Sequence, residues 1–168
     1  KEIVQIQELL NDNLKKDIFV TVARLEKQKG FFRLFDAIAY YKNIANNDFI
    51  WVIIGKGSLK RKLFKYAQDK LLNDQVIFFG QHDNPLPLIK SANLFLFGSY
   101  FEGFPNALAE AVILNTPIIS FDFKSGLNEV IEGYPNATVI STNSIYDFAN
   151  QIKKSLNQKR FEFQPSYN

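Results

Sequence analysis

The segment FIWVIIG, residues 49–55, decides the fold class, because six apolar residues in a row lead directly into a glycine. A strand with one face in water would alternate apolar and polar side chains, whereas a continuous apolar run of this length is typical of a strand covered on both faces. Further short apolar runs follow the same pattern: 18–23, 76–79, 94–97, 117–121 and 137–140. Helical patterns lie between them: 31–45, 59–72, 86–92, 106–115, 127–132 and 144–157.

This alternation predicts an α/β fold with a doubly wound, mainly parallel, Rossmann-like sheet of about six strands and helices on both faces. Residues 1–168 are predicted to form a single domain with a core of about 17–158, and residues 2–12 form either a helix or a connection. Ligands of such sheets bind outside the carboxyl ends of the strands. The loops expected to carry a site are therefore 24–30, 55–58, 80–84, 98–105 and 122–126.

The composition narrows the function classes. There is no cysteine, which excludes disulfides and thiolate metal sites, and the one histidine, His82, cannot form a His-rich metal site by itself. The net charge of +3 is too small to argue for nucleic acid, and no run of about 18 apolar residues predicts a membrane span. The chain also lacks methionine, even at position 1, so we expect it to be a piece of a longer protein.

A lone carboxylate, Glu110, stands among the apolar residues of the helical segment ALAEAVIL, residues 107–114. A buried carboxylate is costly without a partner. Asn106 lies four residues earlier and so shares its helix face. If a phosphate group bound at the helix start, Glu110 would lie one turn further in and could accept hydrogen bonds from the vicinal diol of a ribose. The alternative is a structural ion pair with a lysine or an arginine.

Pro105 is predicted to be the first residue of that helix, because its missing N–H costs nothing there. Phe104 has no side-chain acceptor, so the N–H groups of Asn106 and Ala107 are expected to lack a local acceptor, and an anion could fill that place. The alternatives are that Asn106 caps the helix with its own side chain, or that water does.

Two cations follow the first predicted strand. Arg24 offers a planar fork and Lys29 a compact charge, and both suit phosphate oxygens; the alternative is two solvated surface cations. No Asp-x-Asp pair follows a strand, so a bound diphosphate would be neutralised without a divalent metal. The cluster Lys60, Arg61, Lys62 and Lys65 is interpreted as a solvated helix face rather than a nucleic-acid patch.

Five segments in order resemble one enzyme family. They are VARLEKQKGFFRLFDAI, WVIIGKGSLKRKL, VIFFGQ, GSYFEGFPNALAEAVILNTPIISFD and GLNEVIEG, and they extend from about residue 18 to 140. The fourth contains an E-x7-E motif formed by Glu102 and Glu110. The chain resembles the C-terminal, nucleotide-sugar-binding domain of the retaining, GT-B-fold glycosyltransferases of family 4 (glycosyl transferases group 1). Ala23, Gly98 and Asn115 depart from the usual pattern without removing a charged ligand, which we interpret as drift in packing. A single glycine, Gly126, stands where many members of the family have two, which bears on how closely the chain approaches the sugar.

The resemblance implies a role for each matching position. Arg24 and Lys29 would hold the donor diphosphate, and Glu102 would contact the transferred sugar. Glu110 would bind the ribose hydroxyls. The remaining donor contacts would come from the turn before the helix and from its first residues, namely Phe104, Pro105, Asn106 and Ala107. Weaker contacts to the base would come from two glycine-containing loops, through Gly55, Gly80 and Gln81.

The implied reaction is transfer of a sugar, with retention, from a nucleotide-diphosphate donor to a glycan or lipid-linked acceptor in polysaccharide biosynthesis. UDP-sugars are the commonest donors of the family, and neither a cofactor nor a metal is expected. The acceptor domain would lie N-terminal to this chain, so the chain alone would bind donor without turnover. We expect a cytoplasmic protein, with peripheral membrane association of the full-length protein left open. The alternatives are a nucleotide-sugar epimerase of GT-B fold and a non-catalytic nucleotide-sugar-binding module.

Overall fold

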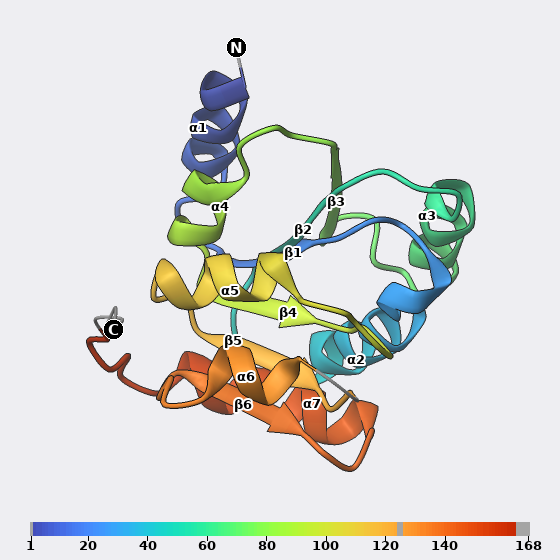
Figure 1. Ribbon diagram of the computed structural model, residues 1–168. Helices are drawn as coiled ribbons and strands as arrows, with labels where there is room; N and C mark the ends of the chain where they lie inside the picture. Colours follow the sequence, from blue (N-terminus) through green and yellow to red (C-terminus); the bar gives the residue numbers. More distant parts are fainter. Residues whose placement is uncertain (1, 124–125, 164–168) are drawn as a thin grey trace.

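The computed structural model describes residues 2–123 and 126–163, with side chains from residue 4 onward. These residues form a six-stranded sheet of order β3-β2-β1-β4-β5-β6, in which every neighbouring pair is parallel (Figure 1). The strands are β1 (Asp17–Val22), β2 (Phe49–Ile54), β3 (Val76–Gly80), β4 (Leu94–Phe97), β5 (Ile118–Phe121) and β6 (Ala137–Ile140). The predicted doubly wound sheet is confirmed.

Helices connect successive strands, as the alternation of patterns predicts. They are α1 (Glu2–Asp12), α2 (Phe31–Ile44), α3 (Lys60–Asp69), α4 (Leu86–Ser91), α5 (Asn106–Ile113), α6 (Leu127–Ile131) and α7 (Ile145–Leu156), with a short 3-10 turn at Lys27–Lys29. Residues 2–12 are therefore a helix. The helix expected to reach residue 72 ends at Asp69, because Leu71 adopts a left-handed backbone with φ of 57°. No helix among the described residues is long and apolar enough to cross a membrane.

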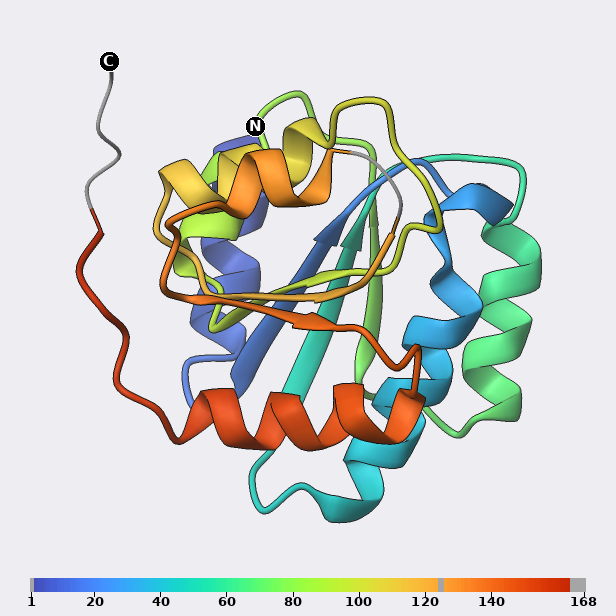
Figure 2. The same ribbon diagram turned by 60° about the horizontal axis from the view of Figure 1, so that its bottom comes forward.

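Both faces of the sheet are covered, which explains the continuous apolar runs. Because side chains alternate along a strand, Trp51 and Ile53 pack with α2, α3 and α7, whereas Val52 and Ile54 pack with α1, α4, α5 and α6. Figure 2 shows α2 and α7 on one side of the sheet and α1, α5 and α6 on the other. Helix α1 adds Ile6 to the second core layer, so the core begins before the boundary of about residue 17 that the sequence indicated.

Aromatic rings fill much of the first core layer. The ring of Phe35 lies 4.8 Å from that of Trp51 in an edge-to-face contact, and Phe121 stacks on Phe148 at 4.4 Å. Two buried polar side chains of this layer bond in series: the Trp51 indole N–H donates to Thr21 Oγ1 (3.0 Å), and the Thr21 hydroxyl donates to the backbone carbonyl of Leu96 (2.7 Å). This layer ties β1, β2 and β4 together at the middle of the sheet.

The strand order creates a switch point between β1 and β4. From β1 the chain winds outward to β2 and β3, and from β4 it winds outward in the other direction to β5 and β6. The connections after β1 and β4 therefore diverge to opposite faces of the sheet, and open α/β sheets bind their ligands in a crevice at this position. The sequence indicated loops at the carboxyl edge of the sheet but not this position along it.

We expect Phe35→Ala to lower the free energy of unfolding by about 3 to 5 kcal/mol, because Phe35 is fully buried against Trp51 and would leave a cavity. Phe101→Ala is the matched control, since that ring is 58% exposed and its loss should cost about 0.5 kcal/mol or less. Urea unfolding followed by circular dichroism measures both. Equal losses would contradict the core described above.

Candidate functional site

The loops that follow β1 and β4 are joined by hydrogen bonds. The Tyr100 N–H donates to the carbonyl of Gln28 (2.9 Å), and the side-chain amide of Gln28 donates to the carbonyl of Phe101 (2.7 Å). Gly30 has φ of 63°, and a Cβ added there would lie 1.8 Å from the carbonyl oxygen of Gly98, so only glycine fits. The two loops consequently form one continuous surface at the switch point.

Lys29 and Glu102 form an ion pair across this junction. The Lys29 Nζ lies 2.6 Å and 2.7 Å from the two carboxylate oxygens of Glu102, and the Ser99 hydroxyl donates to Oε1 of the same carboxylate (2.5 Å). Both side chains of the pair are largely buried, with 13% and 8% of their surfaces exposed. The alternative of a solvated surface cation is therefore wrong for Lys29. The resemblance assigned these residues to different parts of a ligand, and the structure joins them to each other.

Arg24 differs from Lys29 in being exposed at the end of β1. Its loop is held against the loop after β2, because the Leu25 N–H donates to the carbonyl of Lys56 (2.9 Å). The Glu26 carboxylate accepts hydrogen bonds from the backbone and hydroxyl of Ser58, which lower its pKa, and the charge of Arg24 lowers it further. A guanidinium thus stands at the open side of the crevice.

The start of α5 differs from the sequence prediction in two respects. The helix begins at Asn106, and Pro105 is the preceding cap residue with φ of −84° and ψ of 76°, outside the helical region. The Asn106 N–H donates to the carbonyl of Phe104 (3.1 Å), so it does not lack an acceptor. Among the described residues no side chain caps the helix, and its first turn carries no acid. The positive end of the helix dipole therefore has no counter-charge within that turn.

Glu110 lies one turn into α5 and is half-buried. Burial raises the pKa of its carboxyl above the ordinary value. Among the described residues no lysine or arginine forms an ion pair with it, so the structural ion pair that the sequence left open is not found there. Glu110 is a partly desolvated carboxylate at the crevice with capacity to accept hydrogen bonds.

The start of α6 packs against the turn that precedes α5. Gly126 has φ of 77°, and a Cβ there would lie 3.0 Å from the carbonyl of Gly103 and 3.2 Å from Cδ of Pro105. The segments EGFPN and GLNEVIEG are therefore adjacent, as their shared place in the resemblance suggested. Of the predicted loop 122–126, Lys124 and Ser125 lie outside the described residues.

The weaker predicted contacts lie on the β2–β3 side of the crevice. The Gly55 N–H donates to the carbonyl of Gly80 (2.7 Å), which joins the loops after β2 and β3. Gln81 is exposed beside them, as are Phe104 and Asn106 near α5, while Pro105 is buried and Ala107 half-buried. No role of any of these residues is tested by the structure.

Sequence reasoning missed Arg33, a buried guanidinium on α2. It donates to the carbonyl of Gly98 (2.8 Å), to the carbonyl of Ser99 and to Oδ1 of Asn143 (2.6 Å). It also lies 4.1 Å from the ring centre of Tyr100, and burial lowers its pKa. A signal was present in the sequence: one charge inside the apolar run FFRLF, the same kind of anomaly as Glu110.

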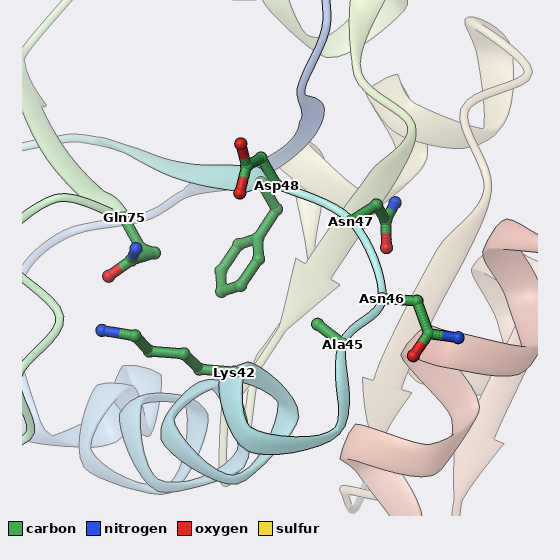
Figure 3. A pocket seen from close by; sticks show the side chains of 7 residues that line it. Lys42, Ala45, Asn46, Asn47, Asp48 and Gln75 are labelled. Carbon is green, nitrogen blue, oxygen red and sulfur yellow. The ribbon is translucent and has the colours of Figure 1, made fainter.

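A polar depression of about 450 Å³ opens at the other end of the sheet, beside the amino end of β2 (Figure 3). Lys42, Asp48 and Gln75 are among the side chains that line it. None of the predicted site residues lines this depression, and the amino ends of parallel strands are not where such sheets bind their ligands. Among the described residues no group of three histidine, aspartate or glutamate side chains could hold a metal ion.

The fold and the site define this chain as a doubly wound α/β domain with a ligand crevice at its switch point. Within that class, it belongs to the family of glycosyl transferases group 1, whose model matches residues 4–168. Similar curated proteins include an uncharacterized glycosyltransferase of Methanocaldococcus jannaschii, 34% identical over 141 residues. Another is N-acetylgalactosamine-N,N'-diacetylbacillosaminyl-diphospho-undecaprenol 4-alpha-N-acetylgalactosaminyltransferase of Campylobacter jejuni, 34% identical over 125 residues.

These two alignments cover 77% and 74% of this chain but 34% and 33% of the relatives, so the chain spans about a third of their length. Among solved structures, a mutant of TarM from S. aureus in complex with fondaparinux, alpha-GlcNAc-glycerol and UDP is similar with a TM-score of 0.79 at 27% identity, over 85% of this chain and 29% of that one. WaaG, a glycosyltransferase involved in lipopolysaccharide biosynthesis, matches in fold with a TM-score of 0.79 at 20% identity, over 92% of this chain and 41% of that one. The Rossmann-like half of a GT-B glycosyltransferase is thereby confirmed.

Arg33→Met should lower the free energy of unfolding by about 2 to 4 kcal/mol, because the carbonyls of Gly98 and Ser99 lose their donors inside the protein. Arg24→Met removes the same charge from an exposed position and should change it by about 0.5 kcal/mol or less. Denaturant unfolding measures the free energy of unfolding of both variants. If Arg24→Met were the more damaging change, Arg33 would not anchor the loop.

Glu110→Gln should be more stable than the unchanged chain near pH 7, and the difference should disappear at about pH 3.5. The reason is that burial raises the folded-state pKa of Glu110 above its unfolded value. A carboxyl of this kind favours folding below its unfolded pKa, and that contribution is lost as pH rises through the folded pKa, whereas glutamine does not ionise. Urea unfolding of both proteins at the two pH values measures this difference in stability. Destabilisation by Gln near pH 7 would indicate a structural role instead.

Proposed function

We propose that this chain is the nucleotide-sugar-binding domain of a retaining glycosyltransferase of family 4. The enzyme moves a sugar from a nucleotide-diphosphate donor to a glycan or lipid-linked acceptor in the synthesis of cell-envelope polysaccharides. One observation carries the proposal: the switch point brings together an exposed guanidinium, the Lys29–Glu102 pair, and the start of α5 with Glu110, which have neither a capping side chain nor an ion-pair partner among the described residues.

The donor diphosphate lies at the start of α5 in this proposal. Arg24 contacts it from the open side, and the positive end of the helix dipole faces it with no competing acid in the first turn. Glu110 lies four residues into the helix, roughly 6 Å further along its axis, where it accepts hydrogen bonds from the two ribose hydroxyls. The desolvation that raises the pKa of Glu110 is relieved when these donors replace lost water.

Lys29 links the diphosphate to the transferred sugar. Its ammonium has three N–H donors, and two of them are directed to the oxygens of Glu102. The third remains for a phosphate oxygen. The positive charge of Lys29 also stabilises the negative charge that develops on the departing diphosphate. Arg24, Lys29 and the helix N–H groups then replace a divalent metal.

The names of several relatives agree with this reaction class. They include the lipopolysaccharide 1,6-galactosyltransferase of Salmonella typhimurium and the capsular polysaccharide biosynthesis glycosyltransferase CapH of Staphylococcus aureus. Since this chain spans about a third of similar curated proteins, we assign acceptor binding to a further, N-terminal domain and only donor binding to this chain. UDP is the proposed nucleotide, in keeping with the TarM complex, and the cytoplasm is the proposed location.

Calorimetric titration of the chain with UDP, GDP and ADP tests the proposal. We expect UDP to bind, and Glu110→Gln and Arg24→Ala each to weaken that binding about 10- to 100-fold, the usual effect of losing a hydrogen bond to a charged group. Glu132→Gln, an exposed carboxylate beyond α6, is the control and should bind UDP unchanged. If none of the three nucleotides bound, or if Glu110→Gln bound UDP as well as the control does, the proposed donor site would be wrong.

A further inference from the structure

Helix α3 displays four cations and one aromatic ring on its outer surface. Lys60, Arg61, Lys62 and Lys65 are all exposed, and Phe64 is 55% exposed among them; these five residues are called the α3 surface. The opposite side of the helix is anchored in the core through Leu63 and Ala67. In both views α3 stands at an outer edge of the molecule (Figures 1 and 2).

The cations at the start of α3 lie at the positive end of its helix dipole, where positive charge is unfavourable. Lys60, Arg61 and Lys62 occupy the first turn, where backbone N–H groups already create a positive end, and no acid accompanies them. None of the four cations of the α3 surface belongs to an ion pair formed among the described residues. A helix that needed only to cover the sheet would carry acids there. The arrangement concentrates positive potential that an external anionic surface would neutralise.

Phe64 adds an apolar contact beside two of these cations. It follows Lys60 by four residues and Arg61 by three, so all three share one side of the helix. Its ring lies 6.0 Å from that of Phe78 on β3, at the end of the sheet, yet more than half of its surface stays in water. An aromatic ring surrounded by cations is typical of segments that lie at a lipid–water interface.

We propose that the α3 surface docks this protein on an anionic lipid bilayer. The cations face the lipid phosphates and Phe64 enters the headgroup layer. A bilayer would engage the exposed ring and the cations together, whereas a solvated helix face engages neither. The inference goes beyond donor binding and is independent of it, because none of the proposed donor contacts belongs to the α3 surface.

Docking through α3 also orients the donor crevice. The loop that leads into α3 is held to the loop of Arg24, since Leu25 donates to the carbonyl of Lys56 and Leu59 donates to the carbonyl of Leu25 (both 2.9 Å). The first turn of α3 therefore belongs to the same edge of the sheet as the crevice. Bound to a bilayer by this turn, the protein would hold that edge close to the lipid surface.

Co-sedimentation with vesicles tests the charge part of the proposal. We expect the chain to bind vesicles of phosphatidylcholine with 30% phosphatidylglycerol, and not phosphatidylcholine alone, and to lose binding as salt is raised. Lys60→Gln, Arg61→Gln and Lys65→Gln together should weaken binding about 100-fold, at about fivefold for each cation. Lys90→Gln, Lys154→Gln and Lys159→Gln remove the same net charge from exposed positions elsewhere and should keep most of the binding.

The substitution Phe64→Trp tests whether the ring at this position enters the lipid headgroup layer. Trp51, the one natural tryptophan, is fully buried, so Phe64→Trp adds a reporter whose emission should shift to the blue when anionic vesicles are added. An unchanged emission, or equal loss of binding in the two triple variants, would overturn the proposal. Tighter binding to a DNA oligonucleotide than to vesicles would assign the surface to nucleic acid and overturn it too.

The same variants separate this inference from the proposed function. The α3 triple variant should bind UDP as the unchanged chain does, with an unaltered melting temperature. If it lost UDP along with the vesicles while remaining folded, the cations would belong to the donor site and the docking proposal would fail. Vesicle binding without UDP binding would instead leave docking intact and contradict the donor site.

Discussion

One buried guanidinium holds the part of the chain on which the site depends. Arg33 reaches from α2 to the carbonyls of Gly98 and Ser99, directly after β4, and to Asn143 ahead of α7. Tyr100 and Phe121 cover it at 4.1 Å and 4.3 Å. A fixed positive charge with several acceptors around it determines where the loop after β4 runs. The position of that loop in turn places Ser99 and Glu102 beside Lys29.

The charges of the crevice are arranged in a way that favours a ligand over stability. Lys29 and Glu102 compensate each other, whereas in the described part of the chain Glu110 is partly desolvated without an ion-pair partner and α5 begins without a capping side chain. Each of the latter two features costs stability that a different side chain would restore. Such exceptions to local rules are expected at functional sites. The start of α5 and the first turn of α3 show the same kind of exception, and both lie at the carboxyl edge of the sheet.

Much of the fold was predictable from the sequence because it rests on local patterns. Each of the six strands and the helices between them was placed within a few residues, since continuous apolar runs and helical spacing need no knowledge of distant contacts. Helix ends were less predictable. Asn115, interpreted as drift in packing, takes the left-handed conformation with φ of 54° that ends α5, so it performs the backbone role of a glycine there. Pro105 was misplaced by one position because capping geometry depends on the preceding turn.

The sequence by itself determined the class of fold, the loops that gather at the carboxyl edge of the sheet, and Glu110 as the anomalous carboxylate of α5. Only the tertiary structure decided the strand order, the switch point between β1 and β4, the pairing of Lys29 with Glu102, and the anchoring role of Arg33. The physical reason is separation along the chain. Lys29 and Glu102 are 73 residues apart, and nothing in local propensity records which distant side chain will neutralise a charge once both are buried.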